Sequence, residues 1–180
     1  MDIAHRTALI VGGTTGIGLG LARRLADAGS TVIVGGRTAD DVDGLATVRI
    51  DVTDPYSVLR ARDEVLGLDL VVTMAGVLLI EDPSDPAHFA ATETTIQVNP
   101  LGTIRVVDAF TPHLVGRGSG DVVTVSSGIA FLPFPPTPSY GASKAGVHAY
   151  TEALRAQLAG TGVGVTELIP PVIATAGRSG

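Results

Sequence analysis

The sequence contains no cysteine and no tryptophan, and only four Phe and three Tyr occur among its 180 residues. Without cysteine, the chain can form neither a disulfide nor a thiolate metal site, and it has no cysteine nucleophile. A long hydrophobic run is also absent near the N-terminus, where Asp2 precedes a short apolar run that ends at glycine. Such a run is too short for a signal peptide or a membrane span, so we expect a cytoplasmic protein.

Basic residues are in the minority, because 12 Lys and Arg stand against 18 Asp and Glu and give a formal net charge of −6. This balance argues against a nucleic-acid surface or an anionic-membrane surface, so any phosphate must be bound by local geometry. No break in composition divides the chain, and we expect a single domain that buries roughly 70% of the surface of its unfolded chain. The histidines are scattered and predict no metal site: His5, His88, His113 and His148.

Six short runs rich in Val, Ile and Leu predict the strands of the fold. Their hydrophobicity is nearly continuous, as in parallel strands that are covered on both faces. Helical segments separate most of them, so the sequence predicts a Rossmann-type, doubly wound α/β fold with strand order 3-2-1-4-5-6. Only the stretch "RTADDVDGLA", whose last residue is the first of the third run, links the second and third runs, so a crossover helix there can have no more than about a turn or two. The runs are "TALIVGG", "TVIVGG", "ATVRIDV", "LDLVVTMAG", "DVVTVSS" and "VGVTELIPP".

Further helices are predicted at residues 54–66, at about 92–114 and at 139–160. In the second of these, Pro100 and Pro112 should bend or interrupt the helix, because proline removes a backbone hydrogen bond and its ring meets the preceding turn.

The stretch "LIVGGTTGIG" places Gly12, Gly16 and Gly18 between the first strand and the first helix. Glycine permits positive φ and a close approach of phosphate, while the helix N-terminus offers free N–H groups. The pattern therefore favours a dinucleotide, although a tight turn with close helix packing has the same glycines. No lysine follows Gly18, so a P-loop nucleotide-hydrolase site is disfavoured.

The end of the second strand reads "VIVGGRTAD" and carries Arg37 where NAD-binding proteins have an acidic residue that binds ribose. An arginine suits a 2′-phosphate, which an aspartate would repel. The sequence thus favours NADP(H) over NAD(H), the alternative being that Arg37 is an ordinary solvated turn residue.

Tyr140 and Lys144 lie four residues apart and so share one face of a predicted helix, while Ser127 closes the fifth strand. A nearby ammonium stabilises a phenolate and makes a tyrosine a usable proton donor and acceptor near neutral pH. A serine hydroxyl can stabilise the charge that builds on a carbonyl oxygen. An amphipathic helix surface explains the pair alone, but not its combination with Ser127 and the glycine turn. The spacing around Ser143 in "GASKAG" does not fit a hydrolase nucleophile.

Together these residues resemble the short-chain dehydrogenase/reductase family, classical type. The sequences around them are most similar to its DltE-like subgroup. The resemblance rests on the glycine turn, Asp51 in "RIDVTD", Asn99 in "QVNPLG", Ser127, and Tyr140 with Lys144. It covers the chain from the first strand to the end and implies one NAD(P)-binding domain over residues 1–180.

By this resemblance, Asn99 joins the catalytic group by positioning Lys144 and its water relay, and Lys144 also holds the nicotinamide ribose. Asp51 and Val52 would contact the adenine, and Thr175 the nicotinamide amide. The expected catalytic residues are Asn99, Ser127, Tyr140 and Lys144. The expected cofactor-binding residues are Gly12, Thr14, Thr15, Gly16, Ile17, Gly18, Arg37, Asp51, Val52, Ala75, Gly76, Tyr140, Lys144, Pro170 and Thr175.

The sequence departs from the family pattern at three places. Thr73 and Met74 replace two asparagines after the fourth strand, which removes a hydrogen bond expected to brace the sheet. Pro170 is followed by a second proline, which is at home in the DltE-like subgroup. The lid helix and seventh strand of the family are missing, so we expect an open substrate side. Members of the family use two dimer surfaces. The one built from helices near 95–113 and 140–158 is present, whereas the one that uses the last strand is not, so the sequence predicts a homodimer.

The leading hypothesis is an NADP(H)-dependent oxidoreductase that moves hydride between the nicotinamide and a carbonyl or alcohol, with Tyr140 as general acid and base. Two alternatives are a nucleotide-binding sensor or interaction protein with little catalysis and a fragment of a longer enzyme. The segment from Phe131 to Phe134 either walls an apolar substrate pocket or is simply buried in its loop. We expect no nucleic-acid and no membrane partner.

Overall fold

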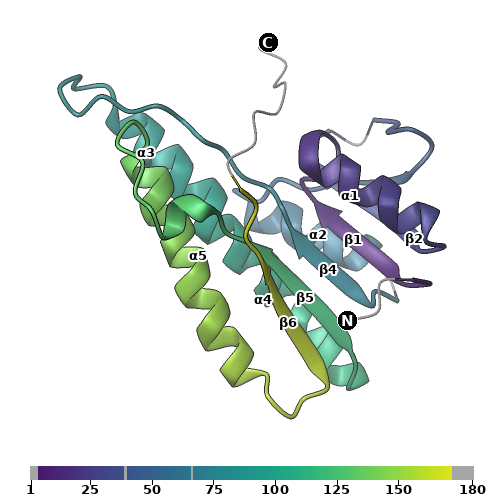
Figure 1. Cartoon of the computed structure of the whole chain (residues 1–180). Helices are drawn as coiled ribbons and strands as arrows, with labels where there is room; N and C mark the ends of the chain where they lie inside the picture. The colour runs from purple at the N-terminus through teal and green to yellow at the C-terminus, as the bar shows by residue number, and fades with distance from the viewer. Residues whose placement is uncertain (1–3, 39, 66, 172–180) are drawn as a thin grey trace.

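The computed structural model describes residues 4–38, 40–65 and 67–171, which build one six-stranded sheet flanked by helices (Figure 1). The strands are β1 (Thr7–Val11), β2 (Thr31–Gly36), β3 (Ala46–Arg49), β4 (Leu70–Thr73), β5 (Gly120–Val125) and β6 (Val163–Leu168). The helices are α1 (Gly16–Asp27), α2 (Pro55–Glu64), α3 (Phe89–Ile96), α4 (Gly102–Arg117) and α5 (Pro138–Gln157), with a π-helical turn η1 (Gln97–Leu101) and a 3₁₀ turn η2 (Gly128–Ala130).

All neighbouring strands of the sheet pair in parallel, in the order β3-β2-β1-β4-β5-β6. The predicted fold class and strand order are confirmed. The order reverses direction between β1 and β4, and the loops that leave these two strands diverge to opposite sides of the sheet. In folds of this type, ligands bind in the crevice at the carboxyl ends of such strands.

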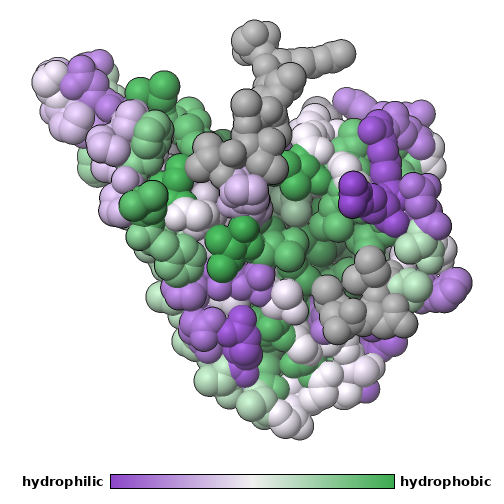
Figure 2. Space-filling model, in the orientation of Figure 1, coloured by the Kyte–Doolittle hydropathy of each residue, from purple (hydrophilic) through white to green (hydrophobic). Residues whose placement is uncertain are grey.

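Two hydrophobic clusters fix the helices to the sheet. Side chains of α2, α4 and α5, such as Val58, Phe110 and Leu154, pack on one face together with alternate strand residues. Ala22 and Leu25 of α1 pack on the other face. No helix of the described residues lies in front of β5 and β6 in Figure 1, and Figure 2 shows hydrophobic residues gathered on that face beside α1. None of the helices within the described ranges is long and apolar enough to cross a membrane.

The helix predicted over about 92–114 forms in three parts, α3, η1 and α4. Pro100 lies inside the π-helical turn, where the wider backbone accommodates its ring and its missing N–H, while Pro112 stays within α4. The expected interruption therefore occurs at Pro100 and not at Pro112. It places Asn99, fully buried, in the wide turn that follows α3.

The connection between β2 and β3 has no helix among its described residues. A turn closed by an antiparallel bridge between Val42 and Leu45 takes the place of a crossover helix. The described residues among the nine between these strands form only a loop, where the sequence allows a helix of at most a turn or two, and β3 forms the edge of the sheet.

The replacement of two family asparagines leaves the sheet with a different brace. Thr73, buried at the end of β4, donates its hydroxyl to the carbonyl oxygen of Val123 on β5 at 3.4 Å. A side-chain hydrogen bond between β4 and β5 is therefore present, supplied by a threonine.

Candidate active site

A cleft of about 620 Å³ lies at the carboxyl ends of the strands, and its volume is in the range of small-molecule sites. Three predicted catalytic residues line it: Ser127, Tyr140 and Lys144. So do the predicted cofactor-binding residues Gly12, Thr14, Thr15, Gly16, Ile17, Gly18, Arg37, Asp51, Val52, Ala75, Gly76 and Pro170. Asn99 lies buried behind the lining, and Thr175 is outside the described residues.

The glycines of the first turn answer two different geometric demands. Gly12 has φ +86°, and a Cβ there would stand 2.6 Å from the backbone nitrogen of Ala75. A Cβ on Gly18 would stand 2.2 Å from the carbonyl oxygen of Gly12. Gly16 has φ +57° and open space around it. Gly12 and Gly18 thus allow close backbone packing, while Gly16 lets the chain turn into α1 with its face to the cleft open.

The N-terminus of α1 is free to receive an anion. Its N-cap residue, Thr15, makes no side-chain capping bond, and the first turn carries no acidic residue. The N–H groups of a first helical turn have no partner within the helix, and the helix dipole adds partial positive charge. Because Thr15, Gly16 and Ile17 line the cleft, these donors face a site that suits a diphosphate.

Arg37 and Asp51 lie together at the β2–β3 end of the cleft. Arg37 is exposed and lines both the main cleft and a smaller adjoining hollow that also contains Arg49 and Arg60. The Asp51 carboxylate accepts hydrogen bonds from the Thr53 hydroxyl at 2.7 Å and the Thr53 N–H at 2.9 Å. These bonds, helped by the charges of Arg37 and Arg49, hold the pKa of Asp51 below its usual value.

The only lysine of the sequence, Lys144, is 5% exposed. Its Nζ donates to the carbonyl oxygen of Val125, the last residue of β5, at 2.8 Å. Burial disfavours the charged form and lowers the pKa of Lys144 to about 8. The side chain is therefore still cationic at neutral pH, although it is held where a lysine is rarely found.

Tyr140 lies one helical turn before Lys144 on α5 and is half-buried in the cleft wall. The ammonium nitrogen of Lys144 is 5.8 Å from the centre of its ring. Ser127 stands across from α5 at the end of β5, where its extended backbone starts the turn η2 and its hydroxyl oxygen accepts from the Ile129 N–H at 3.3 Å. All three side chains line the cleft, and the carbonyl that accepts from Lys144 lies two residues before Ser127 in the chain.

Asn99 holds the wall behind this end. Its amide oxygen accepts from the N–H of Val77 at 2.8 Å, and its amide nitrogen donates to the Val77 carbonyl at 2.9 Å and to the Ser143 hydroxyl at 3.0 Å. Ser143 in turn donates to the Tyr140 carbonyl at 2.7 Å. Ser143 is 1% exposed and fully engaged, which agrees with the rejection of a hydrolase site. Asn99 joins the loop after β4 to α5.

Sequence reasoning did not identify several residues of the cleft. Ser126, next to the predicted Ser127, is buried in the lining, and its hydroxyl has no hydrogen-bond partner in the structure. Met74, Val98 and Ile129 supply apolar lining but look like ordinary core residues in the sequence. The doubled serine after β5 was the one available signal for Ser126.

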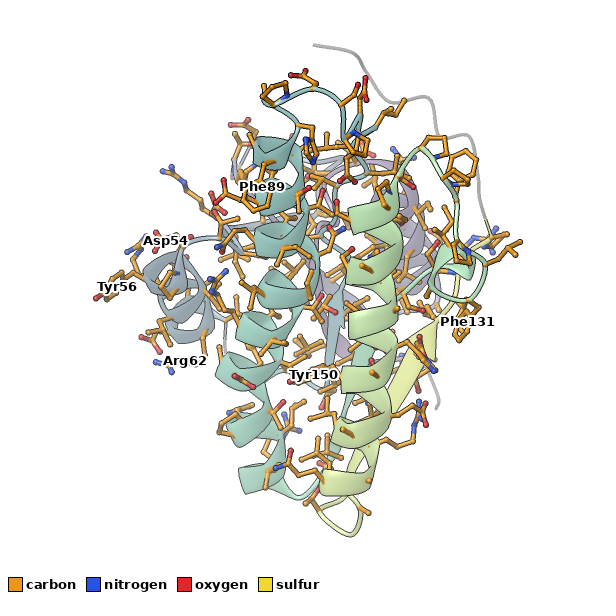
Figure 3. The ribbon with its side chains drawn as sticks, turned by 90° about the vertical axis from the view of Figure 1, so that its left-hand side faces the viewer. Asp54, Tyr56, Arg62, Phe89, Phe131 and Tyr150 are labelled. Atoms are coloured by element: carbon orange, nitrogen blue, oxygen red, sulfur yellow. The ribbon has the colours of Figure 1, made fainter. Side chains whose placement is uncertain are left out.

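The segment that follows η2 fits neither of its two predicted roles. Phe131, Leu132 and Phe134 are 54%, 77% and 50% exposed, so they are not buried in their loop, and they do not line the cleft. Phe131 makes an edge contact with His148 of α5, with ring centres 4.7 Å apart, and Figure 3 shows it beside that helix.

One cluster of metal-ligand types occurs within the described ranges, away from the cleft lining. His148, Glu152 and Glu167 each offer an atom within 4.8 Å of the others. His148 contacts Glu167 at 2.9 Å, and Glu152 is exposed and pairs with Arg155. Glu167 has one oxygen on His148 and the other without a hydrogen-bond partner. The expectation of no metal site stays a prediction.

Comparison with known proteins places this cleft in context. The family model described as short chain dehydrogenase matches residues 6–179. The uncharacterized oxidoreductase DltE of Bacillus subtilis is 32% identical over 192 residues, which cover 97% of this chain and 74% of the relative. Sulfoacetaldehyde reductase 2 of Chromohalobacter salexigens is 35% identical over 182 residues, covering 93% and 72%.

Among solved structures, a short chain dehydrogenase from Burkholderia cenocepacia in complex with NADP superposes with a TM-score of 0.90 at 31% identity. The match covers 98% of this chain and 76% of the other. The resemblance drawn from the motifs is confirmed at the level of the family.

Because Lys144 is the only lysine, its titration can be measured without assignment of other side chains. We expect the ε-methylene signal of protein labelled with ¹³C-lysine to titrate with a midpoint of about 8, against 10.5 for the unfolded chain. Since the unfolded chain then binds more protons between these values, stability contributed at this residue should rise with pH from 8 to 10.5. A midpoint near 10.5 in the folded protein would contradict burial as the controlling effect.

Proposed function

The chain belongs to the short-chain dehydrogenase family and is an oxidoreductase, and we propose that it transfers hydride between NADP(H) and a small carbonyl or alcohol substrate. The observation that carries this proposal is that Ser127, Tyr140 and Lys144 line the same cleft as the glycine turn and Arg37. The residues in this proposal form one nucleotide-binding domain.

The lining of the cleft fits an extended dinucleotide. The free N–H groups at the start of α1 would hold the diphosphate, and Asp51 and Val52 would contact the adenine. Gly76 leaves space beside Lys144, since a Cβ there would stand 3.5 Å from the lysine Nζ, and Ala75, Gly76 and Pro170 would border the nicotinamide. Thr175, proposed to contact the nicotinamide amide, is outside the described residues. When bound, the nicotinamide supplies or accepts the hydride.

The catalytic side chains handle the proton and the charge on the substrate oxygen. In reduction, Tyr140 gives its phenolic proton to that oxygen, and the Lys144 ammonium stabilises the phenolate that remains. The Ser127 hydroxyl donates to the same oxygen and stabilises its developing charge. Asn99 keeps the wall around Lys144 in place through Val77 and Ser143. Oxidation of an alcohol uses the same groups in reverse.

Arg37 supports the choice of NADP(H). The residue before it is glycine, so no carboxylate stands at the end of β2 to bind a free ribose hydroxyl or to repel a phosphate. The nearby Asp51 carboxylate is already engaged by Thr53. Arg37 can therefore direct its guanidinium to a 2′-phosphate, and the Burkholderia structure in complex with NADP agrees with this preference.

The outer faces of α4 and α5 support a homodimer through the helices near 95–113 and 140–158. These helices run side by side in Figure 3, and Tyr150 of α5 donates to the Asp108 carboxylate of α4 at 3.4 Å. Leu101 and Val115 remain 37% and 38% exposed. Contact with a second copy would cover such apolar side chains. A cytoplasmic location also stays a prediction.

Removal of the Arg37 guanidinium should weaken the binding of NADPH selectively. We expect Arg37→Ala to raise the Kd for NADPH about tenfold or more, a loss of about 1.4 kcal/mol or more, and to leave the Kd for NADH nearly unchanged. Isothermal titration of wild type and variant with both cofactors measures this. The control is Arg62→Ala, because Arg62 is a surface residue of α2 that pairs with Asp63. An equal loss for both cofactors would refute a role in 2′-phosphate recognition.

Removal of the Tyr140 hydroxyl should stop proton transfer without emptying the cofactor site. We expect Tyr140→Phe to lower kcat by about 100-fold or more while the Kd for NADPH stays within about twofold of wild type. Turnover is measured by NADPH absorbance with a panel of aldehydes and ketones. Normal turnover in the variant would refute the mechanism. Tight NADPH binding by the wild type with no turnover of any panel member would instead favour the nucleotide-sensor alternative.

The proposed dimer has a direct test in solution. Multi-angle light scattering should give about twice the chain mass of 18.3 kDa. Leu101→Arg, which places a charge on the proposed interface, should shift the protein toward monomer, because a buried unpaired charge opposes association. A tetramer in the wild type would contradict the proposal.

A further inference from the structure

A buried carboxylate that sequence reasoning missed lies close to Tyr140. Glu81, in the loop between β4 and α3, is 8% exposed and does not line the cleft. Burial of a carboxylate is unfavourable unless other groups satisfy its charge and lone pairs. The partners of Glu81 therefore indicate what the residue does.

Both carboxylate oxygens of Glu81 are engaged. One accepts from the Ser139 N–H at 3.0 Å and from the Ser139 hydroxyl at 2.5 Å, and the other accepts from the Thr92 hydroxyl at 2.9 Å. The Glu81 N–H donates to the carbonyl oxygen of Pro136 at 3.0 Å. Burial alone would raise the pKa of Glu81, but the bonds from Ser139 and Thr92 outweigh it and keep the pKa below its usual value. Glu81 is thus an anion at neutral pH.

This anion caps the helix that carries the proposed catalytic pair. Thr137, the N-cap residue of α5, makes no side-chain capping bond, and Pro138 follows it. Since proline has no N–H, the first N–H of α5 is that of Ser139. It donates to the carboxylate of Glu81, which lies 58 residues earlier in the chain. A carboxylate at a helix N-terminus also interacts favourably with the helix dipole. Ser139 immediately precedes Tyr140, so the cap acts on the backbone next to the proposed acid.

A second attachment holds the same turn from its other end. Asn99 donates to the Ser143 hydroxyl, which in turn donates to the Tyr140 carbonyl. Asn99 also accepts from the N–H of Val77, which belongs to the loop that contains Glu81. The backbone of Tyr140 therefore lies between two attachments to this one loop. Loss of either should let the first turn of α5 move relative to the cleft.

We propose that Glu81 is a positioning residue, which fixes the first turn of α5 and thereby sets the place of the Tyr140 hydroxyl. This inference rests on the proposed function for its effect on turnover. The positioning step itself concerns the helix alone and can be measured without a substrate.

The test replaces the carboxylate by an amide of the same shape. In Glu81→Gln, one oxygen remains as an acceptor, while the NH₂ group faces a donor and cannot accept from it. We expect faster amide hydrogen–deuterium exchange in a peptide covering residues 138–144. We also expect kcat to fall about tenfold or more with the best substrate of the aldehyde and ketone panel, and the Kd for NADPH to stay unchanged, because small misplacements of a reacting group cost rate.

The matched control is Asp82→Asn, one residue further along the loop. Asp82 is an exposed carboxylate that accepts from the N–H and hydroxyl of Ser84 and not from α5. The control should leave exchange in 138–144 and kcat at wild-type values. Glu81→Asp keeps the charge on a shorter side chain and should recover part of the kcat lost in Glu81→Gln.

The outcomes separate the two levels of the proposal. Unchanged exchange in Glu81→Gln would overturn the positioning role, as would a lower melting temperature with wild-type exchange in 138–144 and wild-type kcat at low temperature. Faster exchange together with a lower kcat would support it. If the wild type shows no turnover at all, the proposed function fails, whereas faster exchange in the variant would still support the positioning of α5 by Glu81.

Discussion

The hydrogen bond from the Lys144 ammonium to the carbonyl oxygen of Val125 joins α5 to the carboxyl end of β5, and the geometry of the site depends on it. Burial of an ammonium to 5% exposure is unfavourable unless hydrogen bonds replace its lost contacts with water. The bond brings Lys144 and Tyr140 over the strand end where Ser127 begins η2. Burial of the side chain in this position lowers the pKa of the lysine to about 8, so the position that attaches α5 to β5 also disfavours the charged form.

The cofactor end of the cleft follows from a different constraint, close backbone packing. Gly12 lies so near Ala75 that a Cβ would overlap the backbone after β4, and a Cβ on Gly18 would come still closer, 2.2 Å, to the carbonyl oxygen of Gly12. These contacts bring β1, β4 and the start of α1 together, and the first residues of α1 line the cleft. The proposed diphosphate site uses backbone N–H groups and needs no lysine, and the single lysine of the sequence, Lys144, binds the carbonyl oxygen of Val125 instead.

Most of the fold could be predicted from local patterns in the sequence, and most of the residues predicted for the site line one cleft. The apolar runs and the glycine turn gave the strand order, and the four-residue spacing of Tyr140 and Lys144 placed both on one side of α5, because these signals depend on residues near one another in the chain. Glu81 could not be found this way, since its partner Ser139 is 58 residues distant and only the fold brings them together. The π-helical turn at Asn99 could not be predicted either, because Pro100 in the sequence indicates only that the helix is interrupted and not which turn forms there.

The loop after β4 therefore has a function beyond connecting two elements. The loop follows Thr73, the last residue of β4. Within it, Val77 binds Asn99, which donates to Ser143 of α5, and Glu81 accepts from Ser139, so the first turn of α5 is attached to this loop at two points. The same loop also borders the cleft, because Ala75 and Gly76, just before Val77, line the proposed nicotinamide region. The proposed cofactor site and the helix of the proposed catalytic pair are therefore attached to one segment. Loss of the Glu81 bond releases the first turn of α5 but leaves Ala75 and Gly76 where they are, so Tyr140 would move relative to the proposed nicotinamide region.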